Sequence, residues 1–238
     1  MKCITWNIEW ATAASSKGIL IKKVVEDIDP DIVCFTEATL GMIPENGYVI
    51  ESDPNYGYPN NGDRRKVLLW SKQPWQAVDT VGSDALPSGR FVTGITRGIR
   101  FVGVCIPWFE AHVRTGRKDR ARWEDHLHYL DAFTPLADAY CSAGIPVCVM
   151  GDFNQRIPRS RQPFEAAYRL SRVFDAGLKI ATEGIVDEEG HQLIDHVVIC
   201  GQLFANVDKI IPKKSSSGLR LSDHVGIITT ITAETMNN

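Results

Sequence analysis

The sequence lacks any apolar stretch that could cross a membrane, since no run approaches the about 20 residues that a transmembrane helix needs. It also lacks repeats of about 20–50 residues and low-complexity linkers. Its first segment, MKCITWNIEW, contains too short an apolar region for a signal peptide and reads as a first strand. We therefore expect a single cytoplasmic domain over residues 1–238, with no membrane partner and no obligate protein partner.

The six cysteines lack the Cys-x-x-Cys spacing that marks zinc sites and redox motifs, and they do not suggest a disulfide framework. Five lie within strand-like apolar runs, and the sixth, Cys141, lies near the end of a predicted helix. Small buried cysteines of this kind behave as apolar side chains. We expect all six to remain free thiols in a reducing compartment.

Excess positive charge is also missing, because the formal net charge of −3 offers no general attraction to nucleic acid. The basic residues are nevertheless concentrated in three segments: RRK at 64–66, RTGRKDRAR at 114–122 and QRIPRSR at 155–161. A single cluster of this kind is usually solvated surface charge. Three of them beside a candidate site could instead line a groove for a phosphodiester backbone.

The sequence does contain a series of short runs rich in Val and Ile and bounded by Gly, Pro, Asp or Asn, which predict β-strands. We expect strands at residues 2–6, 31–36, 66–71, 90–96, 100–106, 146–151, 194–200 and 225–231. Apolar residues at three- and four-residue steps predict helices at 17–28 and 118–140. Many strands with few intervening helices exclude a simple parallel barrel and favour an α/β fold with mixed sheets packed as a sandwich.

Polar side chains adjoin five of these runs. A carboxylate, amide or imidazole stands at each of these strand ends: Asn7, Glu9, Glu37, Asp152, Asn154, Asp195, Asp223 and His224. Each one alone is more often part of a turn or a solvated strand end. Together they indicate a site, because ligand sites of α/β proteins lie at the carboxyl ends of strands and buried polar groups need partners.

The chemistry of this set can be stated from the side chains. Hard oxygen donors without thiolates favour Mg²⁺ or Mn²⁺ over zinc. Carboxylates, a divalent cation and one histidine suit the attack of water on a phosphate ester. The sequence has neither a serine nucleophile elbow nor a glycine-rich loop that cradles phosphate. We therefore expect a phosphate-ester hydrolase with Mg²⁺ (or Mn²⁺) as its cofactor.

The ordered segments TWNIEWA, IVCFTEA, GDFN, IDHVVI and SDHVGI resemble the motifs of the endonuclease/exonuclease/phosphatase superfamily, the deoxyribonuclease-I-like proteins. The resemblance spans residues 2–230. It implies a four-layer α/β sandwich in which two mixed β-sheets pack face to face with helices outside. The active site would lie at one edge, where strand ends from both halves meet.

The same resemblance implies roles for the strand-end residues. The metal residues of the family correspond to Glu37, Asn7 and Asp223, and its catalytic residues correspond to Asp152, Asn154, Asp195 and His224. In this assignment Asp152 orients or activates the attacking water, and Asp195 orients the imidazole of His224. His196 should point to the other face of the sheet, so we interpret it as structural.

One position departs from the family's pattern. Many members have His or Tyr, which contacts the phosphate, where Cys105 falls in FVGVCIPW. Cysteine is a poor hydrogen-bond donor. Either the alignment slips and a group such as His112 fills this place, or the chemistry relies more on the metal and on arginines such as Arg114.

Two features indicate the substrate class. The segment before Asp195 lacks the Trp-Cys-Asp-Arg motif that is typical of inositol-phosphate phosphatases. The segment RTGRKDRARWEDHL resembles the arginine-rich start of a helix in repair-type nucleases and predicts substrate binding by Arg114, Arg117, Lys118 and Arg120. We expect a divalent-metal-dependent nuclease that acts on nucleic acid, with DNA favoured over RNA. The alternatives are a phosphatase or phosphodiesterase of small-molecule or lipid phosphate esters and an inactive binding module, which the full set of polar residues disfavours.

Overall fold

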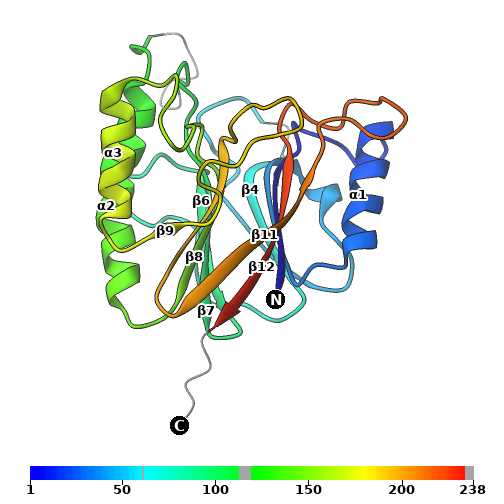
Figure 1. The fold of residues 1–238 in the computed structure, drawn as a ribbon, viewed down its shortest axis with the longest axis horizontal. Coiled ribbons are helices and arrows are strands. Elements are labelled where there is room, and N and C mark those ends of the chain that lie inside the picture. Colours follow the sequence, from blue (N-terminus) through cyan, green and yellow to red (C-terminus); the bar gives the residue numbers. More distant parts are fainter. Residues whose placement is uncertain (61, 113–118, 234–238) are drawn as a thin grey trace.

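The fold is a four-layer α/β sandwich, as the resemblance to the superfamily implied (Figure 1). The computed structural model describes residues 1–60, 62–112 and 119–233. Within these ranges two six-stranded mixed sheets pack face to face. Helix α1 (Ser16–Ile28) covers one sheet, while α2 (Glu124–Ser142) and α3 (Phe164–Phe174) cover the other. That residues 1–238 form one domain stays a prediction.

The first sheet has the strand order β11-β12-β1-β2-β4-β3. Its strands are β1 (Lys2–Asn7), β2 (Ile32–Thr39), β3 (Tyr48–Glu51), β4 (Arg64–Ser71), β11 (Leu203–Ile211) and β12 (Gly226–Ala233). A short 3-10 helix, Leu40–Met42, follows β2. Because β1 and β2 run parallel, with Asn7 opposite Thr36, their polar ends lie at the same edge of the sheet.

The second sheet has the order β5-β6-β7-β8-β10-β9. Its strands are β5 (Gln76–Asp79), β6 (Phe91–Thr96), β7 (Ile99–Cys105), β8 (Val147–Asp152), β9 (Lys179–Ile180) and β10 (Asp195–Cys200). β7 and β8 are parallel, whereas β10 runs antiparallel to β8 with Asp195 opposite Asp152. The register therefore brings the end of β8 and the start of β10 together.

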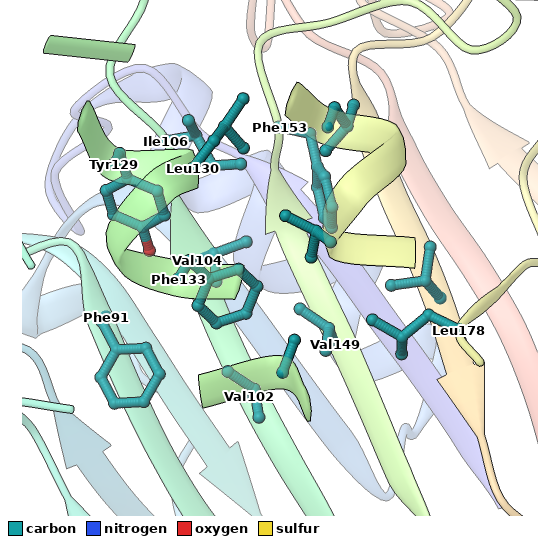
Figure 2. Packing of buried hydrophobic residues seen from close by; sticks show 14 of the residues in the cluster. Phe91, Val102, Val104, Ile106, Tyr129, Leu130, Phe133, Val149, Phe153 and Leu178 are labelled. Atoms are coloured by element: carbon teal, nitrogen blue, oxygen red, sulfur yellow. The ribbon is translucent and has the colours of Figure 1, made fainter. Parts of the chain in front are cut away.

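The central strands are buried on both faces, which explains why their sequences are almost continuously apolar. Between the sheets, one buried cluster includes Cys34, Leu69, Phe101 and Met150. A second cluster lies between the second sheet and its helices, where Val102, Val104 and Val149 pack against Tyr129, Leu130 and Phe133 (Figure 2). These two layers of packing fix the strand ends that carry the polar residues.

The main differences between the predicted and the observed helices are the start of α2 and the presence of a third helix that was not predicted. Helix α2 begins at Glu124 rather than at residue 118, because Trp123 has a left-handed φ of 70° and the Glu124 carboxylate accepts a hydrogen bond from the Ala121 N–H. The first turn of α2 contains the acidic residues Glu124 and Asp125, which are favourable at the N-terminus of a helix and mark its start in the sequence. Helix α3 was missed, although Ala166, Leu170 and Val173 form its buried face at helical spacing.

All eight predicted strands are present, with boundaries that differ by at most three residues. The strands that the sequence did not predict are β3, β5, β9 and β11. They are short or largely exposed, and each lies at or beside the edge of its sheet. Edge strands carry polar and charged residues, so they lack the apolar signal of the central strands.

The expectation that all six cysteines are free thiols is wrong for two of them. Cys141, near the end of α2, forms a disulfide with Cys200 at the end of β10, across a sequence separation of 59. The helix packs its last turn against that strand, which no local spacing of cysteines could reveal. The described residues include the other four cysteines, and these are free and buried. The cytoplasmic location stays a prediction.

Among the described residues, no helix combines the length and the apolar composition needed to span a bilayer.

Candidate active site

The GDFN segment at the end of β8 forms the centre of the polar edge. Gly151 has a φ of 137°, and a Cβ at this position would stand 2.1 Å from the Val104 carbonyl oxygen, so only glycine fits. The next residue, Asp152, accepts hydrogen bonds from the backbone N–H of Asn154 at 2.9 Å and from its side-chain amide at 3.0 Å. The same amide donates to the Ile106 carbonyl at 2.9 Å. The tight turn therefore holds Asp152 and Asn154 side by side.

Asp195 and His224 lie at hydrogen-bond distance, although they come from different sheets. The Nδ1 atom of His224 is 2.5 Å from Oδ2 of Asp195. The Asp195 side chain is buried, and among the described residues its Oδ1 atom has no hydrogen-bond partner. The pair fixes the imidazole with Nδ1–H toward the carboxylate, which leaves Nε2 for another group.

The first sheet closes the site from the other side. The Asn7 side-chain amide donates to Oδ2 of Asp152 at 3.1 Å and so joins the two sheets. The hydroxyl of Ser222 donates to the Asn7 carbonyl at 2.6 Å and accepts from the His224 N–H at 3.1 Å. The serine of the SDH segment therefore ties the histidine loop to the end of β1.

The predicted metal residue Glu37 has a partner that the sequence did not reveal. Its Oε1 atom lies 2.6 Å from Nζ of Lys66, which extends from the neighbouring strand β4 and is almost fully buried. Glu37 also has a left-handed φ of 48°, and Asn154 has one of 52°. Such strained backbone, inside β2 at Glu37 and just after β8 at Asn154, is typical of functional sites.

Asp223, also predicted at the metal, lies at the rim. Its side chain is half exposed, and its Oδ1 atom is 3.9 Å from Nε2 of His224. Arg220 lies 4.0 Å from Asp223 and 2.7 Å from Glu9, so the rim already contains a cation between two carboxylates. Glu9 also faces Lys17 at 3.4 Å.

Burial and mutual charge strongly perturb the central groups. Burial raises the pKa of Asp152 well above its usual range. The imidazolium of His224 lowers this pKa, whereas the carboxylates of Asp195 and Glu37 raise it further. Burial alone would lower the pKa of His224, but the charges of Asp195 and Asp152 raise it well above its usual value. The site therefore favours a protonated imidazole on His224 beside the Asp152 carboxyl group, which loses its proton at a higher pH than an exposed carboxyl group does.

The residues at this edge fit a hard divalent cation. The ligand atoms of Asp152, Asp195 and His224 all lie within 4.8 Å of one another, a group that includes neither Glu37 nor Asp223 of the predicted metal residues. Because the imidazole of His224 favours its protonated form, the oxygens available in this group are those of the two carboxylates, and among the described residues Oδ1 of Asp195 has no hydrogen-bond partner. Asn7 touches this cluster through Asp152, whereas no hydrogen bond among the described residues joins Glu37 to it. The donors are mostly carboxylate and amide oxygens, which suit Mg²⁺ or Mn²⁺.

The two residues considered for the phosphate-binding place, Cys105 and His112, occupy different positions. Cys105 faces Asp152 in the register of β7 and β8, and burial raises the pKa of its thiol to about 12, so it stays neutral. His112 lines a separate hollow with Glu110, Arg120 and Arg122. Its Nδ1 atom accepts from the backbone N–H of Arg120 at 3.3 Å.

The predicted substrate-binding residues are only partly described. Arg114, Arg117 and Lys118 lie outside the described residues. Arg120 is described, and its guanidinium forms an ion pair with Glu124 at 2.8 Å. The structure does not place Arg120 in contact with the strand-end residues.

A buried network behind the GDFN turn was missed by the sequence analysis. His126 donates from Nδ1 to the Pro107 carbonyl at 2.6 Å and accepts at Nε2 from the Gln155 amide at 2.7 Å. That side-chain amide also donates to the Ala166 carbonyl, and the backbone carbonyl of Gln155 accepts from Nε2 of His196 at 2.9 Å. Burial lowers the pKa of each of these two histidines to about 4, so they are neutral. His196 is thus structural, as expected.

A sequence comparison identifies the family. The model of the Endonuclease/Exonuclease/phosphatase family matches residues 4–224. The chain belongs to this family. Membership places it among phosphoester hydrolases, which typically use divalent metal ions. No curated protein sequence matches the chain.

Solved structures of this family share the fold. The 3′ phosphatase NExo from Neisseria, bound to a product DNA hairpin, has a TM-score of 0.72 at 18% identity, covering 98% of this chain and 99% of that one. An AP endonuclease from Archaeoglobus fulgidus has a TM-score of 0.70 at 17% identity, covering 97% and 98%. The human Nocturnin catalytic domain with a bound sulfate has a TM-score of 0.66 at 16% identity, covering 98% and 93%. At these identities the likeness establishes the fold.

Proposed function

We propose that the chain is a divalent-metal-dependent nuclease that hydrolyses phosphodiester bonds of nucleic acid, with DNA favoured over RNA. The observation that carries this proposal is the convergence of two hydrogen-bonded pairs at one edge. Asp152 accepts from Asn154 at 2.9 and 3.0 Å, Asp195 lies 2.5 Å from His224, and the ligand atoms of Asp152, Asp195 and His224 lie within 4.8 Å of one another. Two structural neighbours, a phosphatase bound to a DNA hairpin and an AP endonuclease, add support for a nucleic-acid substrate.

Asp152 is the residue that holds the attacking water. Its carboxylate is fixed by amide donors of Asn7 and Asn154, so it cannot rotate away from the position where a water would stand. Burial makes this carboxylate more basic than an exposed one, which suits a group that takes a proton from water.

His224 stabilises the phosphate on the other side. Its Nδ1–H is committed to Asp195, so its Nε2–H can donate to a phosphate oxygen or to the leaving oxygen. Asp195 orients the ring and favours its charged form. Asn154 supplies a side-chain amide that donates to Asp152.

The metal completes the charge balance. Glu37 and Asn7, with Asp223 nearby, would hold Mg²⁺ or Mn²⁺, which offsets charge on the phosphoryl oxygens when it is bound. Lys66 then stays close to that position through its contact with Glu37 and adds positive charge.

The experiment is a substrate panel with Mg²⁺ or Mn²⁺: plasmid, abasic duplex, single-stranded DNA, RNA, inositol phosphates and p-nitrophenyl esters. We expect metal-dependent cleavage of at least one nucleic acid, abolished by EDTA and by Asp152→Asn. The matched control is Asp208→Asn, an exposed carboxylate on β11 whose side-chain hydrogen bonds among the described residues come from Asn206 and Thr230. Turnover of inositol phosphates without cleavage of any nucleic acid would overturn the nuclease assignment.

A further inference from the structure

An aromatic cleft lies next to the polar edge and is not used by the mechanism above. This cleft, of about 570 Å³, is lined by rings and chains that include Trp108, Phe109, Trp123, Asn154, Arg156 and Arg161. Its volume is in the range of ligand pockets. Asn154 belongs both to this cleft and to the proposed catalytic group, so a ligand in the cleft would touch the reacting centre.

The aromatic wall of the cleft is exposed but rigid. Trp108 is 46% exposed, although a tryptophan at a protein surface is normally covered. Its ring packs edge-on against Phe109 at 5.0 Å, and Phe109 lies 5.7 Å from Trp123. The preceding Pro107 carbonyl accepts from the buried His126. The tryptophan is therefore held in place before any ligand arrives.

Two cationic side chains separate this cleft from the catalytic hollow. Arg156 and Arg161 line the aromatic cleft and also the adjacent hollow of about 220 Å³ that contains Asp195 and His224. Among the described residues neither guanidinium forms an ion pair or a hydrogen bond, whereas Arg159 between them donates to the Gln162 carbonyl. Unpaired guanidinium groups beside a phosphate-cleaving site are suited to bind a second phosphate.

We propose that the aromatic cleft binds the nucleotide next to the scissile phosphate, with its base stacked on Trp108 and its phosphate held by Arg156 and Arg161. This proposal rests on the proposed nuclease function and deepens it. A base can stack on a protein ring only when it is not stacked in a duplex, so the substrate is single-stranded or unpaired at this position. An apolar peptide or lipid would leave the two arginines without a partner.

The stacking step is tested by removing the ring and the base in turn. Binding of a fluorescently labelled thymidine decamer and of an abasic decamer of equal length is measured by anisotropy in EDTA, so that no strand is cleaved. Base–aromatic stacking typically changes affinity by about five- to 150-fold. We expect Trp108→Ala to weaken binding of the thymidine decamer by about tenfold or more. The same change should leave binding of the abasic decamer unaltered, and Trp108→Phe should restore most of the loss.

The control for this experiment is Phe204→Ala, which removes another exposed ring, on β11 of the other sheet. It should leave both affinities at the wild-type value. Equal binding of the two decamers by the wild-type chain, or no effect of Trp108→Ala, would overturn the stacking proposal. So would the absence of any single-strand binding.

The phosphate step is tested by salt dependence. Each phosphate contact to a single strand adds about 0.7 to the slope of log affinity against log salt concentration. The double change Arg156→Gln and Arg161→Gln should therefore reduce this slope by about 1.4. The control variant is Arg172→Gln, because Arg172 on α3 is exposed and pairs with Asp175. This variant should leave the salt slope unchanged. An unaltered slope in the double variant would show that these arginines do not bind phosphate.

These measurements separate the two proposals. Turnover of bis(p-nitrophenyl) phosphate with Mg²⁺ reports on the catalytic group without a nucleobase. If that turnover and all nucleic-acid cleavage are absent while the decamer binds through Trp108, the nuclease function fails, and what stands is single-strand binding in the cleft with a base stacked on Trp108. If cleavage occurs but Trp108→Ala changes neither affinity nor KM for single strands, the cleft proposal fails and the nuclease function stands.

Discussion

The buried histidine behind the GDFN turn predicts how stability changes with pH. His126 is neutral in the folded protein because burial lowers its pKa from 6.5 to about 4, although its contact with Pro107 acts in the opposite direction. The unfolded chain therefore takes up a proton on this residue at a higher pH than the folded protein does. The stabilising effect of the neutral ring is present above pH 6.5 and is lost as the pH falls toward 4.

The size of the effect follows from the shift. One unit of pKa corresponds to about 1.4 kcal/mol, so the full loss is about 3 kcal/mol, of which about 2 kcal/mol has occurred at pH 5. The active-site carboxylates also titrate, but they are the same in the wild type and in a variant at this position. The difference in pH dependence between the two proteins therefore isolates His126.

The assay is urea unfolding at pH 7.5 and pH 5.0 for the wild type, His126→Asn and the control His128→Asn, on the same helix. His126→Asn lowers stability at pH 7.5 because Gln155 loses its acceptor. Between the two pH values it should lose about 2 kcal/mol less than the wild type, while the control follows the wild type. If His126→Asn shows the wild-type difference, the buried neutral histidine is not the cause and the reasoning is refuted.

Three further predictions concern the catalytic pair, the metal and the disulfide. His224→Ala should reduce kcat by a factor of about 10²–10⁴, and Asp195→Asn should reduce it by a smaller factor. The double variant should be only slightly slower than His224→Ala, because the two residues act as one unit, and single-turnover rates will test this. Lys66→Met removes a cation beside the metal-binding glutamate, so the Mg²⁺ concentration for half-maximal activity should fall roughly tenfold; a rise would contradict this. Reduction of the Cys141–Cys200 disulfide should lower the free energy of unfolding by about 2–4 kcal/mol, and Cys141→Ser should abolish the response to reductant.

The sequence revealed residues whose position is set by their own strand. Asp152 and Asp195 each stand at one end of a short, almost continuous apolar run, so the run and its change to polar residues were enough to mark them as candidates. The central strands and a sandwich of mixed sheets followed from the same signal, whereas the four-layer arrangement was implied by the resemblance to the family. The exposed edge strands gave no such pattern, which is why β11 was missed despite its length.

Residues whose role depends on a distant partner could not be found in this way. Lys66 looked like one member of a surface RRK cluster, yet β4 brings it against Glu37 across 29 positions of sequence. His126 and Gln155 looked like ordinary polar residues of a helix and a loop. The Cys141–Cys200 disulfide depends on how a helix ends against a strand. In each case the missing information is tertiary packing.

The site is therefore a consequence of how the two sheets meet. Asp152 and Asp195 come from the second sheet, whereas Asn7 comes from the first sheet and His224 from the loop that leads into its strand β12. The contacts Asn7–Asp152 and Asp195–His224 therefore both join the two halves of the fold. A shift of one sheet against the other would separate water activation from the imidazole without unfolding either sheet. The buried apolar layer between the sheets thus sets the catalytic geometry as well as the stability of the fold.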